Sequence, residues 1–221
     1  MGIIARATFA SAARRQSPTP SPAPSPAPSP SPSLRPATPA DADDIVDLTI
    51  AAGDGLPLVL WQALAPPGMD PRLLGRQRAR RPTGGYSYTR AEMATVDGAV
   101  AGAIIDYALA DSPEPVTAET PALVVPLNEL ENLVCGSWYV NILAVKPHWQ
   151  RRGIGRMLLA AADRRARDHG KRVVSIIVSD ANQAARTLYR AHGFTRLAQR
   201  PMVKPGWHGP GDHWLLLTKQ V

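Results

Sequence analysis

A short loop in the second half of the chain combines glycine and arginine in a way that could hold a phosphate. It reads Gln150-Arg151-Arg152-Gly153-Ile154-Gly155-Arg156 and runs into an apolar pattern with helical spacing. A helix N-terminus offers unpaired N–H groups and about half a positive charge. The two glycines would let a phosphate approach the backbone, because no Cβ stands in the way. The loop is therefore a candidate phosphate cradle.

The loop departs from two common phosphate-binding motifs. A dinucleotide-binding fingerprint needs a third glycine at position 158, where Leu158 stands. A Walker A loop needs Gly-Lys-Ser/Thr, which is missing from the sequence. Taken alone, two glycines in a basic loop also fit an ordinary turn, so the evidence must come from the surrounding residues.

A second group of residues follows at a helical spacing. Asn182 opens a predicted helix, and Tyr189 lies seven residues later on the same helix face. Each residue also has a purely structural interpretation, since asparagine is a common helix N-cap and tyrosine a common core residue. The segment ends in His192-Gly193-Phe194.

The two groups together carry a family resemblance. Leu143-Ala144-Val145 and Pro147 lead into the cradle, and Asn182, Tyr189 and Phe194 follow in order. Over roughly residues 137–198 this resembles the GNAT superfamily of acetyl-CoA-dependent N-acetyltransferases. The resemblance implies that the strand end at Leu143, Ala144 and Val145 pairs with the pantetheine arm of acetyl-CoA. It implies that the cradle amides hold the pyrophosphate, that Asn182 bonds the pantetheine arm, and that Tyr189 protonates the departing thiolate as general acid.

The elements that must position these residues can be predicted from periodicity and turn residues. Strands are expected at Leu34–Ala37, Tyr86–Val96, Val100–Leu109, Trp138–Val145, Arg172–Val178, Phe194–Ala198 and His213–Lys219. Helices are expected from Thr38 to Gly53, in pieces over 56–81, at Leu127–Val134, at Ile154–His169 and at Asn182–His192. The order predicts an α/β fold: a GNAT-like mixed, mostly antiparallel central sheet with helices on both faces and a splayed cofactor-binding strand pair.

The general base is the weakest part of the sequence evidence. A lysine amine has a pKa of about 10.4, so a lysine acceptor would need a base to lose its proton. Ribosomal-protein acetyltransferases of this family often carry a glutamate late in the strand before the asparagine, where this chain has Ile177. Glu131 and Glu129 are substitutes on position alone, with Glu131 preferred, and water could also relay the proton. Both lie at the end of the 110–136 connection, which is expected to cover a substrate site.

Composition sets the outer limits. The chain has 221 residues, a formal net charge of +7, one cysteine and no apolar run near the roughly 20 residues that span a bilayer. Pro alternates with Ser, Thr and Ala from Ser17 to Ser33, so residues 1–33 are expected to be a disordered tail, with a targeting segment as the alternative, and 34–221 the folded domain. Arg72, Arg76 and Arg80 share a helix face, interpreted as a solvated face.

Three functions compete for this sequence. The leading hypothesis is a cytoplasmic N-acetyltransferase, monomer or homodimer, that uses acetyl-CoA and an amine acceptor and has no metal, membrane or nucleic-acid partner. The alternative is a non-catalytic acyl-CoA-binding or sensing module; Tyr189 favours the enzyme, because binding alone needs no proton donor at the sulfur. A nucleic-acid binder is disfavoured, since few aromatic residues interleave with the basic ones. The acceptor stays open among peptide N-termini, lysines, aminoglycosides and polyamines.

Overall fold

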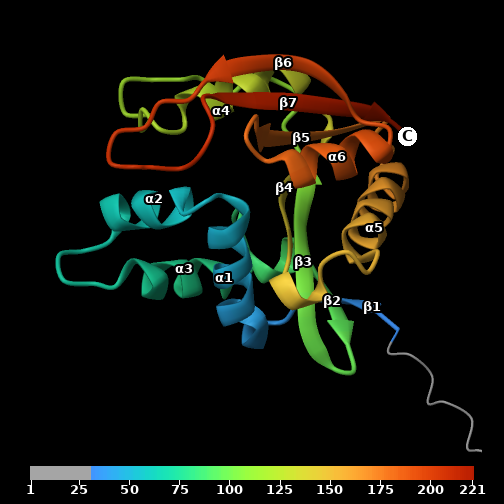
Figure 1. Cartoon of the computed structure of the whole chain (residues 1–221). Helices are drawn as coiled ribbons and strands as arrows, with labels where there is room; N and C mark the ends of the chain where they lie inside the picture. The colour runs from blue at the N-terminus through green and yellow to red at the C-terminus, as the bar shows by residue number, and fades with distance from the viewer. Residues whose placement is uncertain (1–30) are drawn as a thin grey trace, which may run out of the picture.

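The fold is built on one seven-stranded sheet with the order β1-β2-β3-β4-β5-β7-β6 (Figure 1). A computed structural model describes residues 31–221. The strands are β1 (Ser33–Pro36), β2 (Ala91–Val96), β3 (Ala99–Ala108), β4 (Trp138–Val145), β5 (Val173–Ser179), β6 (Thr195–Pro201) and β7 (His213–Gln220). Of the predicted tail, residues 1–30 lie outside the described part, and Ser33 already pairs in β1.

The sheet is mixed, as predicted. The β4–β5 pair is parallel, and the other neighbouring pairs are antiparallel. In Figure 1 the strands β5, β7 and β6 run in a clearly different direction from β2 and β3. The change of direction falls between β4 and β5, so the parallel pair is the place where the two parts of the sheet diverge.

Helices cover both faces of the sheet. On one face, α5 (Ile154–Asp168) and α6 (Gln183–Ala191) enclose a core that includes Ile104, Val140 and Leu158. On the other face, α1 (Ala42–Ala52) and α3 (Pro71–Ala79) pack near β2, β3 and β4, with α2 (Leu56–Leu64) beside them. The remaining helix, α4 (Val125–Glu131), lies against β6 and β7. This arrangement confirms the predicted fold class.

The parallel pair opens partway along its length. Only Trp138–Val140 of β4 pair with Val174–Ile176 of β5. The next residue, Asn141, is skipped in the register with β3, where Ile105 pairs with Ile142 and Asp106 with Val140. Such a bulge bends a strand and increases its twist. The bulge at Asn141 therefore explains why β4 leaves β5 at this point, as the predicted splayed pair requires.

One predicted strand is shorter in the structure. The strand expected at Tyr86–Val96 begins only at Ala91, because residues 88–90 form a 3-10 turn. The Ser87 hydroxyl donates to the Arg81 carbonyl and its oxygen accepts from the Thr89 N–H, which holds the chain out of the sheet. In the stretch expected to be helical in pieces over 56–81, Pro71 marks the boundary by standing as the first residue of α3. A proline there loses nothing, since that N–H has no helical acceptor.

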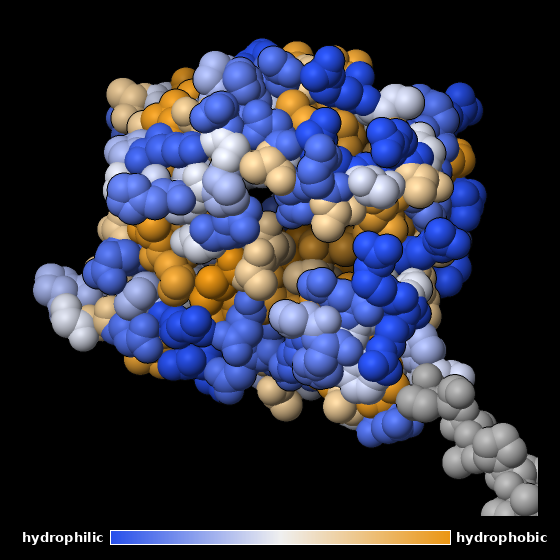
Figure 2. Space-filling view, viewed as in Figure 1, coloured by the Kyte–Doolittle hydropathy of each residue, from blue (hydrophilic) through white to orange (hydrophobic). Residues whose placement is uncertain are grey.

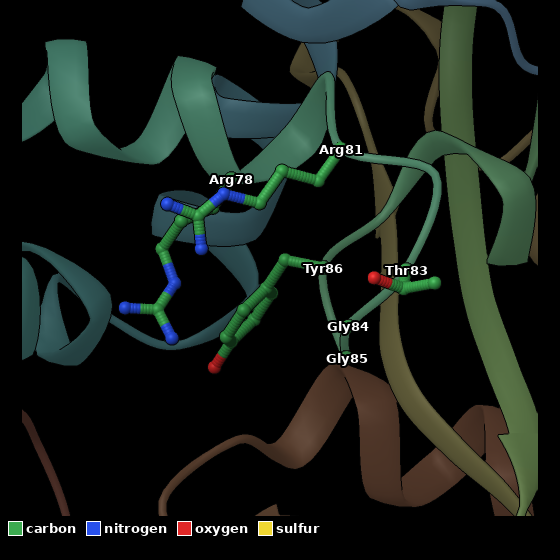
Figure 3. A pocket seen from close by; sticks show the side chains of 6 residues that line it. All are labelled: Arg78, Arg81, Thr83, Gly84, Gly85 and Tyr86. Carbon is green, nitrogen blue, oxygen red and sulfur yellow. The ribbon is translucent and has the colours of Figure 1, made fainter.

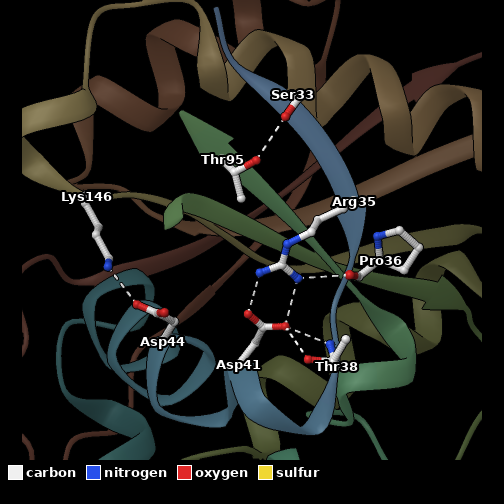
Figure 4. Close-up of polar contacts among 8 residues, drawn as sticks. All are labelled: Ser33, Arg35, Pro36, Thr38, Asp41, Asp44, Thr95 and Lys146. Carbon is white, nitrogen blue, oxygen red and sulfur yellow. Dashed lines mark hydrogen bonds and ion pairs between the residues drawn. The ribbon is translucent and has the colours of Figure 1, made fainter. Parts of the chain in front are cut away.

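The start of the domain is tied down by polar contacts (Figure 4). The Asp41 carboxylate accepts two hydrogen bonds from Arg35 at 2.6 and 2.9 Å, and two more from the backbone N–H and the hydroxyl of Thr38. The Arg35 hydrogen bonds lower the pKa of Asp41 to about 2. In the first turn of α1, Asp44 pairs with Lys146 at 2.6 Å, which fixes this end of α1 against the end of β4. These contacts hold the strand end that leads into the glycine loop.

No helix within residues 31–221 is long and apolar enough to cross a membrane.

Candidate active site

The glycine loop presents free backbone donors at the start of α5. Gly153 is the N-cap and has φ +82°, and Arg151 has φ +63°. The first helical hydrogen bond runs from the Met157 N–H to the Gly153 carbonyl. Within the described chain, the N–H groups of Ile154, Gly155 and Arg156 donate to no acceptor. They are the unpaired donors that a phosphate binds at a helix N-terminus.

The arginines of the loop strengthen this positive end. Arg151, Arg152 and Arg156 are exposed and form no ion pair with any residue in 31–221. The Arg152 guanidinium lies 4.8 Å from the centre of the Trp149 ring, which restrains it near the loop. Three free guanidinium groups around unpaired amides would suit the pyrophosphate of acetyl-CoA.

The end of β4 offers a strand edge. Past the bulge at Asn141, residues Ile142 to Val145 pair with β3 on one side and with no strand of the described domain on the other. Leu143, Ala144 and Val145 therefore have the free edge that an extended pantetheine arm could join. One atom is already used: the Gln150 amide donates to the Val145 carbonyl at 3.0 Å. Gln150 thus closes the turn between strand and cradle.

Figure 2 shows a hollow between the upper and lower parts of the molecule, with apolar residues exposed inside it. It lies over the region where, in the same view in Figure 1, β4 separates from β5 below α6. The free edge of β4 and the N-terminus of α5 meet in this region. The position and shape of the hollow fit an extended ligand that ends in phosphates.

Gly153 and Gly155 each need to be glycine, but for different structural reasons. A Cβ on Gly153 would meet no atom within 4 Å, so its glycine is needed for the positive φ and for open approach. A Cβ on Gly155 would lie 2.9 Å from Leu188 Cδ2. Gly155 therefore also allows α5 and α6 to pack closely, a role that the sequence pattern alone did not reveal.

Asn182 and Tyr189 lie on α6 as expected. The Asn182 side-chain oxygen accepts from the Ala185 N–H at 3.0 Å, so this residue does cap the helix. Its amide nitrogen makes no hydrogen bond within the described residues and remains available to a ligand. The capping interpretation and the ligand interpretation are therefore compatible.

The Tyr189 ring is buried, with 4% of the residue exposed, and packs at 5.9 Å from Phe194. In the part of the chain that the structure describes, its hydroxyl makes no hydrogen bond. Burial raises the pKa of Tyr189 above its ordinary value of about 10. The phenol is thus protonated at neutral pH and is a proton donor without a partner among residues 31–221.

Glu131, at the C-terminal end of α4, has the most perturbed carboxyl group in this region. Burial raises its pKa from 4.5 to about 7, against a hydrogen bond from the Tyr139 hydroxyl that lowers it. Two further tyrosines belong to the same group: Tyr107 packs edge-on to Tyr139 at 5.9 Å, and Glu131 raises the pKa of both Tyr86 and Tyr107. A pKa near neutrality is what a general base requires.

Glu129, the other candidate for the general base, forms an ion pair with a neighbouring strand. Glu129 pairs with Arg200 of β6 at 2.7 Å, which anchors α4 to the sheet. Ile177, at the position where related enzymes carry glutamate, packs in an apolar cluster with Leu130 and Leu216. The sequence alone singled out none of the three tyrosines, Tyr86, Tyr107 and Tyr139, as a site residue. They come from distant segments, and no local pattern joins them.

Comparison with known proteins identifies the class. Residues 97–196 match the family model of the acetyltransferase (GNAT) domain. This part of the chain therefore matches the GNAT acetyltransferase domain, a family that takes its acetyl group from acetyl-CoA. The match covers β3 to the start of β6, which includes the splayed strands, the cradle and α6. A search of curated protein sequences finds no significant match.

Solved structures share the whole fold at low sequence identity. A crystal structure described as an acetyltransferase is 22% identical and covers 85% of this chain and 98% of its own, with a TM-score of 0.58. An N-acetyltransferase from Staphylococcus aureus Mu50 is 19% identical, with coverages of 84% and 99% and a TM-score of 0.57. A polyamine N-acetyltransferase from Drosophila melanogaster is 14% identical, with coverages of 86% and 100% and a TM-score of 0.61. These similarities establish the fold alone.

Proposed function

We propose that this protein is an N-acetyltransferase that transfers the acetyl group of acetyl-CoA to a primary amine by direct attack. The observation that carries the proposal is the open β4–β5 pair above a helix N-terminus with three unpaired N–H groups. A strand edge and a phosphate cradle at this separation suit a pantetheine arm followed by a pyrophosphate.

Holding the amine against the thioester is the main contribution of the protein. Fixing two reactants in the right geometry can supply up to about 7–11 kcal/mol of the barrier. Acetyl-CoA supplies the activated acetyl group. Its pantetheine arm would be oriented by the Asn182 amide and by the strand end Leu143, Ala144 and Val145. Its phosphates would be bound by the backbone amides of Ile154, Gly155 and Arg156 and by the side chains of Arg151 and Arg152.

Proton transfer needs a base for the amine and an acid for the sulfur. Glu131 fits the base because its pKa of about 7 leaves it largely ionised just above neutrality while still able to accept a proton. Tyr189 fits the acid because its hydroxyl is protonated and makes no hydrogen bond in the described domain. The two groups lie on α4 and α6, from opposite faces of the sheet.

The test is an acetyl-CoA-dependent screen of amine classes with release of free thiol as the readout, together with calorimetric titration of acetyl-CoA. Transfer to at least one amine class supports the enzyme. Tight acetyl-CoA binding without transfer to any amine would contradict it and favour a non-catalytic acyl-CoA-binding module.

A further inference from the structure

A small pocket beside Tyr86 is lined by two arginine side chains that pair with no acid among residues 31–221. Its volume is about 50 Å³, and it is lined by Arg78, Arg81, Thr83, Gly84, Gly85 and Tyr86. Figure 3 shows both guanidinium groups and the Tyr86 phenol extending to the same side of the pocket. The pocket lies outside the phosphate cradle, since its residues come from the end of α3 and the segment that follows it.

Neighbouring arginines show what a structural role looks like on the same helix. Arg72 pairs with Asp47 of α1, and Arg76 with Asp43 and Asp70. Arg78 and Arg81 form no ion pair with any residue of the described domain, although Arg78 is half-buried. Guanidinium groups recognise carboxylates and phosphates through paired hydrogen bonds. Arg78 and Arg81 are therefore free for an anion from outside.

Tyr86 links this pocket to the proposed base. Burial raises the pKa of Tyr86, the Arg78 guanidinium opposes the shift, and the Glu131 carboxylate adds to it. The pKa of Tyr86 thus depends on both Arg78 and Glu131. The ring is fixed by an edge-on contact with Trp61 at 6.1 Å. A Cβ on the pocket residue Gly85 would lie 3.5 Å from the Tyr107 hydroxyl, and Tyr107 packs edge-on to Tyr139. The pocket therefore adjoins the tyrosines that surround Glu131, so we treat the two as parts of one acceptor site.

The charge around this site favours a particular kind of acceptor. A third guanidinium, that of Arg90, lies 4.3 Å from the centre of the Tyr107 ring. Three arginines near one half-buried carboxylate would repel a polycation. An amine with an anionic group matches the site, with its nitrogen toward Glu131 and its anion toward Arg78 and Arg81.

We propose that the acceptor is an amine that also carries a carboxylate or phosphate, held in the pocket by Arg78 and Arg81. The inference rests on the proposed acetyltransferase function and adds the substrate class to it. Because the two anions share their chemistry here, the experiment uses one probe of each kind.

Matched acceptors test the anionic group directly. Arginine is compared with agmatine, which lacks the carboxylate, and phosphoethanolamine with ethanolamine. In at least one pair, kcat/KM is expected to be about tenfold or more higher for the anionic member, with the gain mainly in KM. Equal or better use of both partners that lack the anionic group would overturn the inference while leaving the acetyltransferase intact.

Substitutions of the two pocket arginines test whether the anionic group of the acceptor binds in this pocket. Arg78→Gln and Arg81→Gln are each expected to raise the KM of the preferred anionic acceptor by about tenfold, with the KM of acetyl-CoA unchanged. Arg80→Gln is the matched control, because Arg80 is exposed beside the same pocket without lining it. An equal effect of all three substitutions would overturn the assignment to this pocket.

A binding measurement separates this inference from the proposed function. The same acceptors are titrated by calorimetry onto the full chain, with and without CoA. Stronger binding of the anionic member, lost in Arg78→Gln and kept in Arg80→Gln, supports the pocket whether or not turnover occurs. Failure of acetyl transfer to every amine would contradict the enzyme, and failure of the titrations to distinguish the paired acceptors would contradict the anion site.

Discussion

The proposed acetyl-CoA side and the proposed acceptor side of this site, here called the donor side and the acceptor side, are built from different parts of the chain. The donor side is mostly backbone: the free edge of β4, the positive φ at Gly153 and the unpaired amides at the start of α5. The acceptor side is made of side chains, among them Glu131, Tyr139 and Arg78, from segments far apart in the chain. Substitutions on the donor side should therefore act through backbone access, and those on the acceptor side through a single functional group.

The largest effect on catalysis is expected from a substitution of Tyr189. Tyr189→Phe keeps the buried ring and its contact with Phe194 and removes only the hydroxyl. A positioned acid contributes about 10²–10⁴-fold, so kcat should fall by an amount in that range while acetyl-CoA affinity changes little. Steady-state kinetics and calorimetry measure the two quantities.

Tyr88→Phe is the control for this substitution, since Tyr88 lies in a 3-10 turn away from α6. If kcat of Tyr189→Phe stays within about twofold of wild type, the general-acid role is wrong. If affinity falls and kcat holds, Tyr189 is a binding residue, the non-catalytic acyl-CoA-binding module gains support, and the division between a backbone donor side and a side-chain acceptor side breaks down.

Glu131→Gln should have the next largest effect, at the lower end of the acid–base range, about 10²-fold in kcat/KM at pH 8. The base works only when ionised, and its pKa is about 7, so wild-type activity should rise with pH through neutrality. The variant should lose this rise. A pH profile of kcat/KM measures it.

Glu129→Gln is the matched control, because Glu129 precedes Glu131 by two residues and is paired with Arg200. It should keep the pH profile of wild type. A Glu131→Gln enzyme that retains the rise near pH 7 would show that another group, or water, removes the proton.

On the donor side, Gly153→Val should weaken acetyl-CoA binding by about tenfold or more, since a branched side chain would stand in the open approach to the amides. Gly155→Val should also weaken it, but in addition it places a side chain against Leu188 at 2.9 Å. Overpacking of this kind costs about 1–3 kcal/mol of stability. Calorimetry and thermal unfolding distinguish the two variants.

Gly170→Val is a control for backbone strain, since Gly170 has a positive φ of 67° and open space around it but ends α5 far from the cradle. It should lose stability without losing acetyl-CoA affinity. If Gly153→Val binds acetyl-CoA as wild type does, the cradle is not the phosphate site.

The smallest expected effect concerns stability and pH. Folding raises the pKa of Glu131 from 4.5 to about 7, so the folded state holds this proton more tightly than the unfolded state. The contribution of Glu131 to stability is therefore lost as pH rises through that window. Glu131→Gln should raise Tm relative to wild type at pH 8 and leave the difference near zero at pH 4. A variant that is less stable than wild type at pH 8 would contradict the shift.

Local sequence determined much of the donor side. The helix that starts at Ile154, the helix that follows Asn182 and the bounds of β4 at Trp138–Val145 were all predicted and are found in the structure. These features depend on helix capping, φ preference and periodicity, which act over a few neighbouring residues. The assignment of these residues to acetyl-CoA stays a prediction.

Only the tertiary structure decided the acceptor side. Position alone gave a preference for Glu131 over Glu129 without a physical reason; the structure adds the pairing of Glu129 with Arg200 and the burial of Glu131. Similarly, the arginine face of α3 was predicted to be solvated, yet Arg72 and Arg76 pair with acids of α1, while Arg78 on another face lines a pocket without a partner. Burial and charge pairing depend on which distant segments the fold brings together, and a local pattern does not contain that information.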